Sequence, residues 1–116
     1  MLHSEYLIGA ILITFGVILK LFPPEHINSW YGYKTPFSMK NKDIWNEGNH
    51  FAAILLVYIG ASSLIVAVIC DVIYIGDFDR AFKNSTTISI IGLLCFIPLT
   101  EIHLRRLFDK NGNRKM

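Results

Sequence analysis

The sequence predicts an all-α integral membrane protein with three transmembrane helices and a long cytoplasmic loop between the first two. Only 17% of its 116 residues are charged, against roughly 25% in soluble proteins. Three windows, at 6–19, 51–70 and 84–100, hold no charged residue. Segment 54–69 has only three polar side chains, so it lacks the polar face of a helix in a soluble protein. The length allows a single domain, at residues 1–116.

The first predicted span covers residues 6–22. Its charge-free part is shorter than the ~20 residues that cross a bilayer, but Lys20 lies near the end, where its ammonium group can reach the lipid headgroups. No Lys or Arg occurs at 2–6, so we expect a retained helix rather than a cleaved signal peptide. Pro23 and Pro24 are expected to end it.

A loop at 23–50 follows and contains both tryptophans. Segment 34–36 is expected to be extended, because the residue before a proline avoids the helical region. Ser38 is predicted to cap a helix that begins at Met39 and runs into the second span, with a bend near Gly48.

The second span is predicted at 51–71 and the third at 86–104, with a short acidic connector between them. Pro98 is expected to bend the third span, because it removes a backbone donor. The first two spans contain small residues at heptad spacing, which allow close packing of helices in lipid. These residues are Gly9 and Gly16 in the first span, and Ala53, Gly60 and Ala67 in the second.

Lys and Arg are unevenly distributed outside the spans. Nine of them lie in the first loop, at Lys20 and in a tail at 105–116, whereas the connector holds only Arg80 and Lys83. Because cytoplasmic loops carry an excess of these residues, we expect a multi-pass protein of the cell membrane. Its N-terminus would lie outside, and its loop and C-terminus would be cytoplasmic.

Several function classes are disfavoured. A net charge of +2 does not supply the basic surface typical of nucleic-acid binding. The sequence has no phosphate-binding glycine loop, nucleophile elbow or HExxH motif, so we expect neither an enzyme nor a cofactor. Glu47 and His50 have the spacing of half a di-iron site, but such sites need a second copy and two more carboxylates. No metal site is therefore expected.

In the second span, the hydroxyl group of Ser62 or Ser63 is expected to form a hydrogen bond with the backbone.

The loop contains a dense motif of aromatic, glycine and proline residues. Its positions are Asn28, Trp30, Tyr31, Gly32, Tyr33, Lys34, Thr35 and Pro36, followed by Trp45 and Asn49. This motif closely resembles the signature of the SdpI family, named for a bacterial membrane protein that gives immunity to a peptide toxin. The tail at 108–115 also resembles the family's ending. The family more often has Arg at the position of Lys34, and Lys cannot make the same bidentate contact.

The motif allows two interpretations. Its aromatic and basic residues could form an interfacial belt in contact with lipid headgroups. Gly32 and Pro36 instead favour a fixed, packed loop. At the inner end of the third span, Glu101 could pair with Arg105 at helical spacing, or it could mark a site, with Asn49 and Lys34 as neighbours.

Three functions are compatible with these observations. The resemblance implies a resistance or immunity protein that binds a membrane-active peptide toxin. A membrane anchor could instead recruit a cytoplasmic regulator such as a repressor. A minimal transporter would require a homo-oligomer, since three helices hardly enclose a path. In every case the lipid bilayer is a partner.

Overall fold

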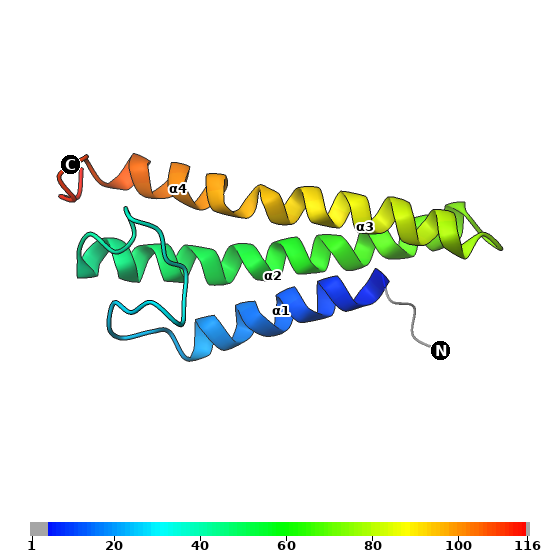
Figure 1. The fold of residues 1–116 in the computed structure, drawn as a ribbon, viewed down its shortest axis with the longest axis horizontal. Coiled ribbons are helices and arrows are strands. Elements are labelled where there is room, and N and C mark those ends of the chain that lie inside the picture. Colours follow the sequence, from blue (N-terminus) through cyan, green and yellow to red (C-terminus); the bar gives the residue numbers. More distant parts are fainter. Residues whose placement is uncertain (1–4, 116) are drawn as a thin grey trace.

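A computed structural model describes residues 5–115; Met1–Ser4 and Met116 lie outside the described residues, and with them most of the segment compared with signal peptides. The described chain is helical, and its only strand-like feature is a bridge between Phe108 and Arg114. It measures 54 × 24 × 20 Å. Figure 1 shows α2 (Lys42–Ile73) lying between α1 (Glu5–Leu21) on one side and α3 (Phe78–Leu94) and α4 (Phe96–Leu107) on the other.

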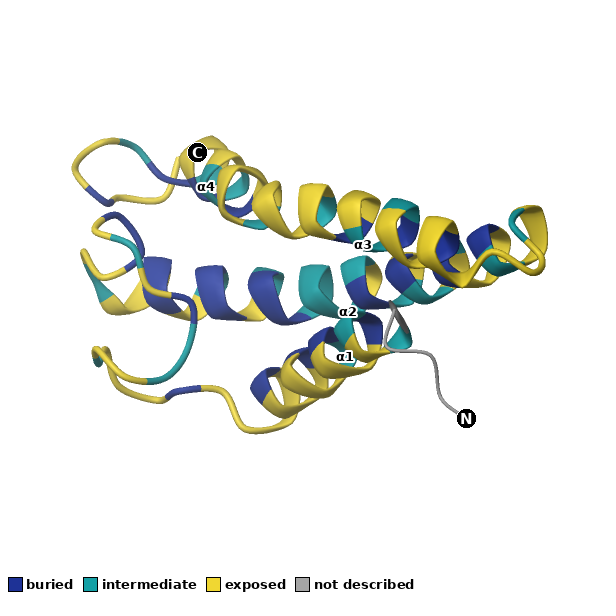
Figure 2. Cartoon of the chain, turned by 45° about the vertical axis from the view of Figure 1, so that its right-hand side comes forward, coloured by how far each residue is buried: buried dark blue, intermediate teal, exposed yellow. Residues whose placement is uncertain are grey.

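Two segments are long and apolar enough to cross a membrane. They are Lys42–Ile73 and Phe78–Leu107, whereas α1 belongs to the shorter apolar helices. Large apolar side chains cover the outer faces: Phe15, Ile65 and Leu94 are at least 59% exposed. Figure 2 shows extensive exposed surface along α1, α3 and α4, whereas α2 between them is mostly buried or intermediate. Soluble monomers rarely expose so much apolar surface, so the structure is consistent with lipid as the solvent.

The small residues of α1 and α2 meet as predicted. A Cβ added at Gly9 would lie 2.8 Å from the carbonyl oxygen of Gly60, and one at Gly16 would lie 2.9 Å from that of Ala53. Contacts under 3.0 Å leave no room for a side chain. The two helix backbones therefore approach as closely as glycine allows, which fixes α1 against α2.

The predicted third span is divided into α3 (Phe78–Leu94) and α4 (Phe96–Leu107), with Cys95 between them. The division follows from Pro98, whose missing N–H and bulky ring act on the carbonyl of Leu94, four residues earlier. The helix is thus interrupted one turn before the proline, where a bend was expected, and it continues three residues beyond the predicted end at 104.

Two local predictions were wrong. Helix α2 begins at Lys42, because Asn41 accepts the N–H of Ile44 and caps it. The Ser38 hydroxyl instead accepts the N–H of Thr35 in a preceding turn. The hydroxyl of Ser63 lies 2.6 Å from that of Ser89 in α3, so it bonds across helices rather than to the backbone.

The predicted bend near Gly48 corresponds to no break in α2, which is one continuous helix of 32 residues. Gly48 is buried, and a Cβ there would lie 3.3 Å from Leu104 and 3.5 Å from Tyr33. Its small size thus allows the loop and α4 to approach α2.

Candidate functional site

The motif loop (residues 22–41) folds back over the first turns of α2, where Asn49 holds it. The Asn49 carbonyl oxygen accepts the N–H of Tyr33 at 2.6 Å. Its amide donates to the carbonyl of Trp45 at 2.9 Å and more weakly to that of Tyr33. Asn49 is buried. A buried amide with these partners fixes one loop conformation, because leaving it unsatisfied is costly.

Gly32 has a backbone conformation that other residues rarely adopt, with φ at 108°. A Cβ there would lie 2.6 Å from the Asn49 side-chain oxygen and 2.8 Å from Pro24. Both the dihedral angle and the space therefore require glycine. This geometry agrees with the predicted fixed turn.

Asn28 organises the start of the motif. Its side-chain oxygen accepts the N–H groups of Trp30 and Tyr31, at 3.0 and 2.8 Å. The Tyr31 hydroxyl then donates to the carbonyl of Phe22 at 2.6 Å, which ties the loop to the end of α1.

The two tryptophans have opposite environments. Trp45 is fully buried and donates its indole N–H to the carbonyl of Pro24 at 2.9 Å. Trp30 is 81% exposed. Trp45, in α2, is therefore packed against the loop, whereas Trp30 has the exposure expected of an interfacial aromatic side chain.

Glu101 on α4 receives two hydroxyl donors from the loop. The Tyr33 hydroxyl lies 2.7 Å from its carboxylate and that of Thr35 lies 3.0 Å away. Burial and the neighbouring carboxylate raise the pKa of Tyr33 well above its ordinary value. Tyr33 thus remains a donor over the physiological pH range and holds the carboxylate against the loop.

The predicted partners of Glu101 are only partly correct. Asn49 reaches it indirectly, through Tyr33. Among residues 5–115 no ion pair joins Glu101 to Arg105, whose guanidinium lies 4.5 Å from the ring centroid of Phe37. The Lys34 ammonium donates to the carbonyl of Ser29, so it also does not pair with Glu101. Pro36 is exposed beside these residues.

The structure adds a pair of side chains that the sequence did not predict. Glu47 pairs with His103 at 3.0 Å rather than with His50, and the His103 ring stacks on Phe51. Spacing along one helix could not reveal this pair, because its members lie on α2 and α4. No group of three His, Cys, Asp or Glu side chains in the described chain is placed to hold a metal.

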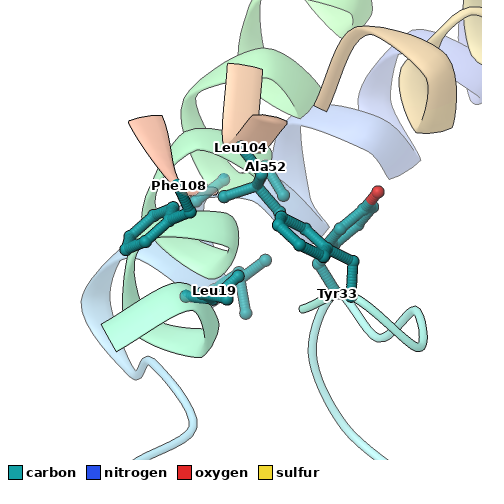
Figure 3. Close-up of a cluster of buried hydrophobic side chains, with 8 residues drawn as sticks. Leu19, Tyr33, Ala52, Leu104 and Phe108 are labelled. Atoms are coloured by element: carbon teal, nitrogen blue, oxygen red, sulfur yellow. The ribbon is translucent and has the colours of Figure 1, made fainter. Parts of the chain in front are cut away.

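The C-terminal tail (residues 108–115) packs against the same end of the bundle. Phe108 is buried, and the amide of Asn41 donates to the carbonyl of Gly112 at 2.7 Å. Arg114 forms an ion pair with Asp43 at 2.8 Å, which raises the pKa of the guanidinium. Figure 3 shows the resulting cluster, in which α1, the loop, α2, α4 and the tail all contribute. Its labelled members are Leu19, Tyr33, Ala52, Leu104 and Phe108.

An apolar groove of about 360 Å³ opens beside the motif. One wall is α1, with the exposed ring of Phe15. The opposite wall contains Leu56 of α2 and Phe96 of α4, and motif residues 30–33 close one end. The groove therefore joins the motif to the outer surface of the bundle.

Comparison with known proteins identifies a matching family. The SdpI/YfhL protein family matches residues 25–101, a range that includes the whole motif and Glu101. The chain belongs to the SdpI/YfhL family. It is 46% identical over 59 residues to the uncharacterized protein YfhL of Bacillus subtilis (strain 168), and this match covers 51% of each chain. The chain thus spans about half the length of that curated relative. No solved structure matches.

Proposed function

We propose that this member of the SdpI/YfhL family is a three-span membrane protein that protects its host against a membrane-active peptide. The proposal combines the family with one structural observation, the apolar groove between α1, α4 and the motif loop. Such peptides carry apolar side chains at the depth of the bilayer. A groove that opens on the outer surface of the bundle lets these side chains enter from the lipid.

The proposed topology has the N-terminus outside and both the motif loop and the tail in the cytoplasm. The loop and the tail lie at the same end of the bundle, as expected when two spans, α2 and α3 with α4, separate them (Figure 1). The excess of Lys and Arg in these two segments favours the cytoplasm for that end. At 1.5 Å per residue the 17 residues of α1 extend about 25 Å. Lys20 and a locally thinner bilayer can compensate for that short length.

The topology is tested by single cysteines in a chain whose Cys70 and Cys95 are replaced by alanine. A cysteine at Asp77 should react with an impermeant thiol reagent in intact cells, and one at Lys42 should be protected. The opposite labelling pattern would contradict the proposed orientation.

The protective function is tested by filling the groove. Leu56 and Ile59 lie three residues apart on α2, but Ile59 lines a different cavity, beside α3. Deletion of the gene should sensitise the host to a peptide from a panel of membrane-active toxins. Leu56→Trp should then fail to restore protection at normal membrane abundance, whereas the matched Ile59→Trp should restore it. Unchanged sensitivity of the deletion strain across the panel would contradict a protective role.

A further inference from the structure

We propose that a second pocket, on the loop end of the bundle, binds a phosphate group. The pocket has a volume of about 260 Å³ and is lined by Pro36, Phe37, Lys40, Arg105 and Lys110. Its three cations come from the motif loop, α4 and the C-terminal tail. No carboxylate lines it. Two sources of this chemistry are possible: the headgroup of an anionic phospholipid, or a soluble phosphate.

The cations of this pocket have no carboxylate partner within the described chain. The ion pairs of the described chain involve other cations, those of Arg80, His103 and Arg114. Four of the acidic groups at this end are already engaged elsewhere. Asp43 and Glu47 contact Arg114, Glu101 accepts hydroxyls of the loop, and Asp109 accepts backbone N–H groups of its own tail. Three like charges thus converge on one pocket, where a bound anion would relieve their repulsion.

The ring of Phe37 orients two of these cations. The guanidinium of Arg105 lies 4.5 Å from the ring centroid, and the ammonium of Lys40 lies 5.7 Å from it. A cation over a ring face keeps its N–H donors available to other groups. Lys40 donates to the carbonyl of Lys110, and an ammonium has three donors. Arg105 can present two parallel donors, the geometry that matches a phosphate.

The Lys110 side chain completes the pocket without a structural role. It is exposed, and the hydrogen bond of this residue uses only its carbonyl. The opposite end of the bundle provides matched cations, Arg80 and Lys83, which precede the apolar part of α3. In the proposed topology the pocket lies at the inner leaflet; phosphate binding itself does not depend on the protective function.

The test uses the purified full chain in neutral detergent micelles and three probes. These are a short-chain phosphatidylglycerol, a short-chain phosphatidylcholine and inorganic phosphate, each titrated by calorimetry. We expect phosphatidylglycerol to bind at least about tenfold more tightly than phosphatidylcholine, with an affinity that falls as salt rises. Inorganic phosphate binding as tightly as phosphatidylglycerol would support the pocket and assign it to a soluble ion. Weaker phosphate binding would support a lipid headgroup.

The variants decide whether this pocket is responsible. Lys110→Gln should weaken binding of the preferred probe about tenfold, and Lys110→Arg should retain it. Arg105→Lys should weaken it because a bidentate contact is lost, whereas Lys83→Gln should leave it unchanged. The proposal would be overturned if neither anionic probe bound, or if Lys110→Gln and Lys83→Gln bound equally well. Neither result would bear on protection by the groove, which is measured in cells.

Discussion

The two ends of the bundle are built in contrasting ways. At the loop end, Trp45 and Leu104 are fully buried, and Asn49 bonds to two backbone segments. At the connector end, Ile75 is 81% exposed and Gly76 has no atom within 4 Å of an added Cβ. Figure 2 shows the same contrast in burial along α2. In a bilayer, apolar side chains contact lipid tails about as favourably as they contact another helix, so apolar contacts alone do not specify how helices pack. Polar contacts are therefore concentrated at the loop end, although the connector half also has the hydroxyl pair of Ser63 and Ser89 and the hydrogen bond from Tyr6 to Asp71.

The largest difference is expected between two glycines with positive φ. Gly32→Ala should lower the free energy of unfolding by about 2–5 kcal/mol, because it combines backbone strain with displacement of the Asn49 amide. Gly76→Ala should cost only the strain, about 1–2 kcal/mol. Unfolding in mixed micelles measures both, and equal losses would show that the two ends are packed alike.

The next comparison concerns two helical asparagines. Asn49→Ala should cost about 1–3 kcal/mol, because it leaves the buried N–H of Tyr33 without an acceptor. Asn84→Ala, on α3, serves as the matched control and should change stability by less than about 0.5 kcal/mol. A similar loss in both variants would remove the special role assigned to Asn49. The same unfolding assay applies.

A smaller effect is expected at the Tyr33 hydroxyl, and it depends on pH. Tyr33→Phe should cost about 1–1.5 kcal/mol at neutral pH, through loss of the bond to Glu101. Because folding raises the pKa of Tyr33, the native state holds its proton more tightly than the unfolded chain. This stabilisation is complete below about pH 10, the ordinary tyrosine pKa, and is lost as pH rises further.

The pH dependence is measured from thermal unfolding between pH 7 and pH 11. The wild type should lose stability above about pH 10 more steeply than Tyr33→Phe. Tyr58→Phe, at an exposed position on α2, should follow the wild type. Parallel curves for all three proteins would contradict the raised pKa.

The smallest effect is expected at the hydroxyl pair in the connector half. Ser63→Ala should cost about 0.6 kcal/mol, the typical value for a polar contact between helices in lipid. The double variant with Ser89→Ala should be no worse, since it leaves neither hydroxyl alone in an apolar environment. A double variant that is much less stable would show that the connector half also relies on polar contacts.

The sequence predicted the features that depend on local pattern. The apolar windows marked the helices, and the glycines at 9, 16 and 60 predicted the close contact of α1 with α2. The bend expected at Pro98 corresponds to the division of the helix at Cys95, since the effect of proline on a helix is intrinsic. Three helices spanning the membrane, and their orientation, stay predictions.

Contacts between distant segments could not be predicted in the same way. Arg105 lies four residues after Glu101, yet Glu101 bonds to Tyr33 and Thr35, which lie more than 60 residues earlier. From the sequence alone, several side chains could have been the partner of Glu101. The packing of the loop places the hydroxyls of Tyr33 and Thr35 beside its carboxylate. Ser38 and Asn41 are both good caps, and the turn that occupies the Ser38 hydroxyl decides between them.

The contact between α2 and the C-terminal tail also has a consequence for biosynthesis. Asn41 and Asp43 bond to Gly112 and Arg114, each across 71 residues of chain. At about 5–20 residues per second, a ribosome adds those residues in roughly 4–14 s. The start of α2 therefore emerges seconds before its partners exist. The loop end must therefore remain incomplete until the tail has been synthesised.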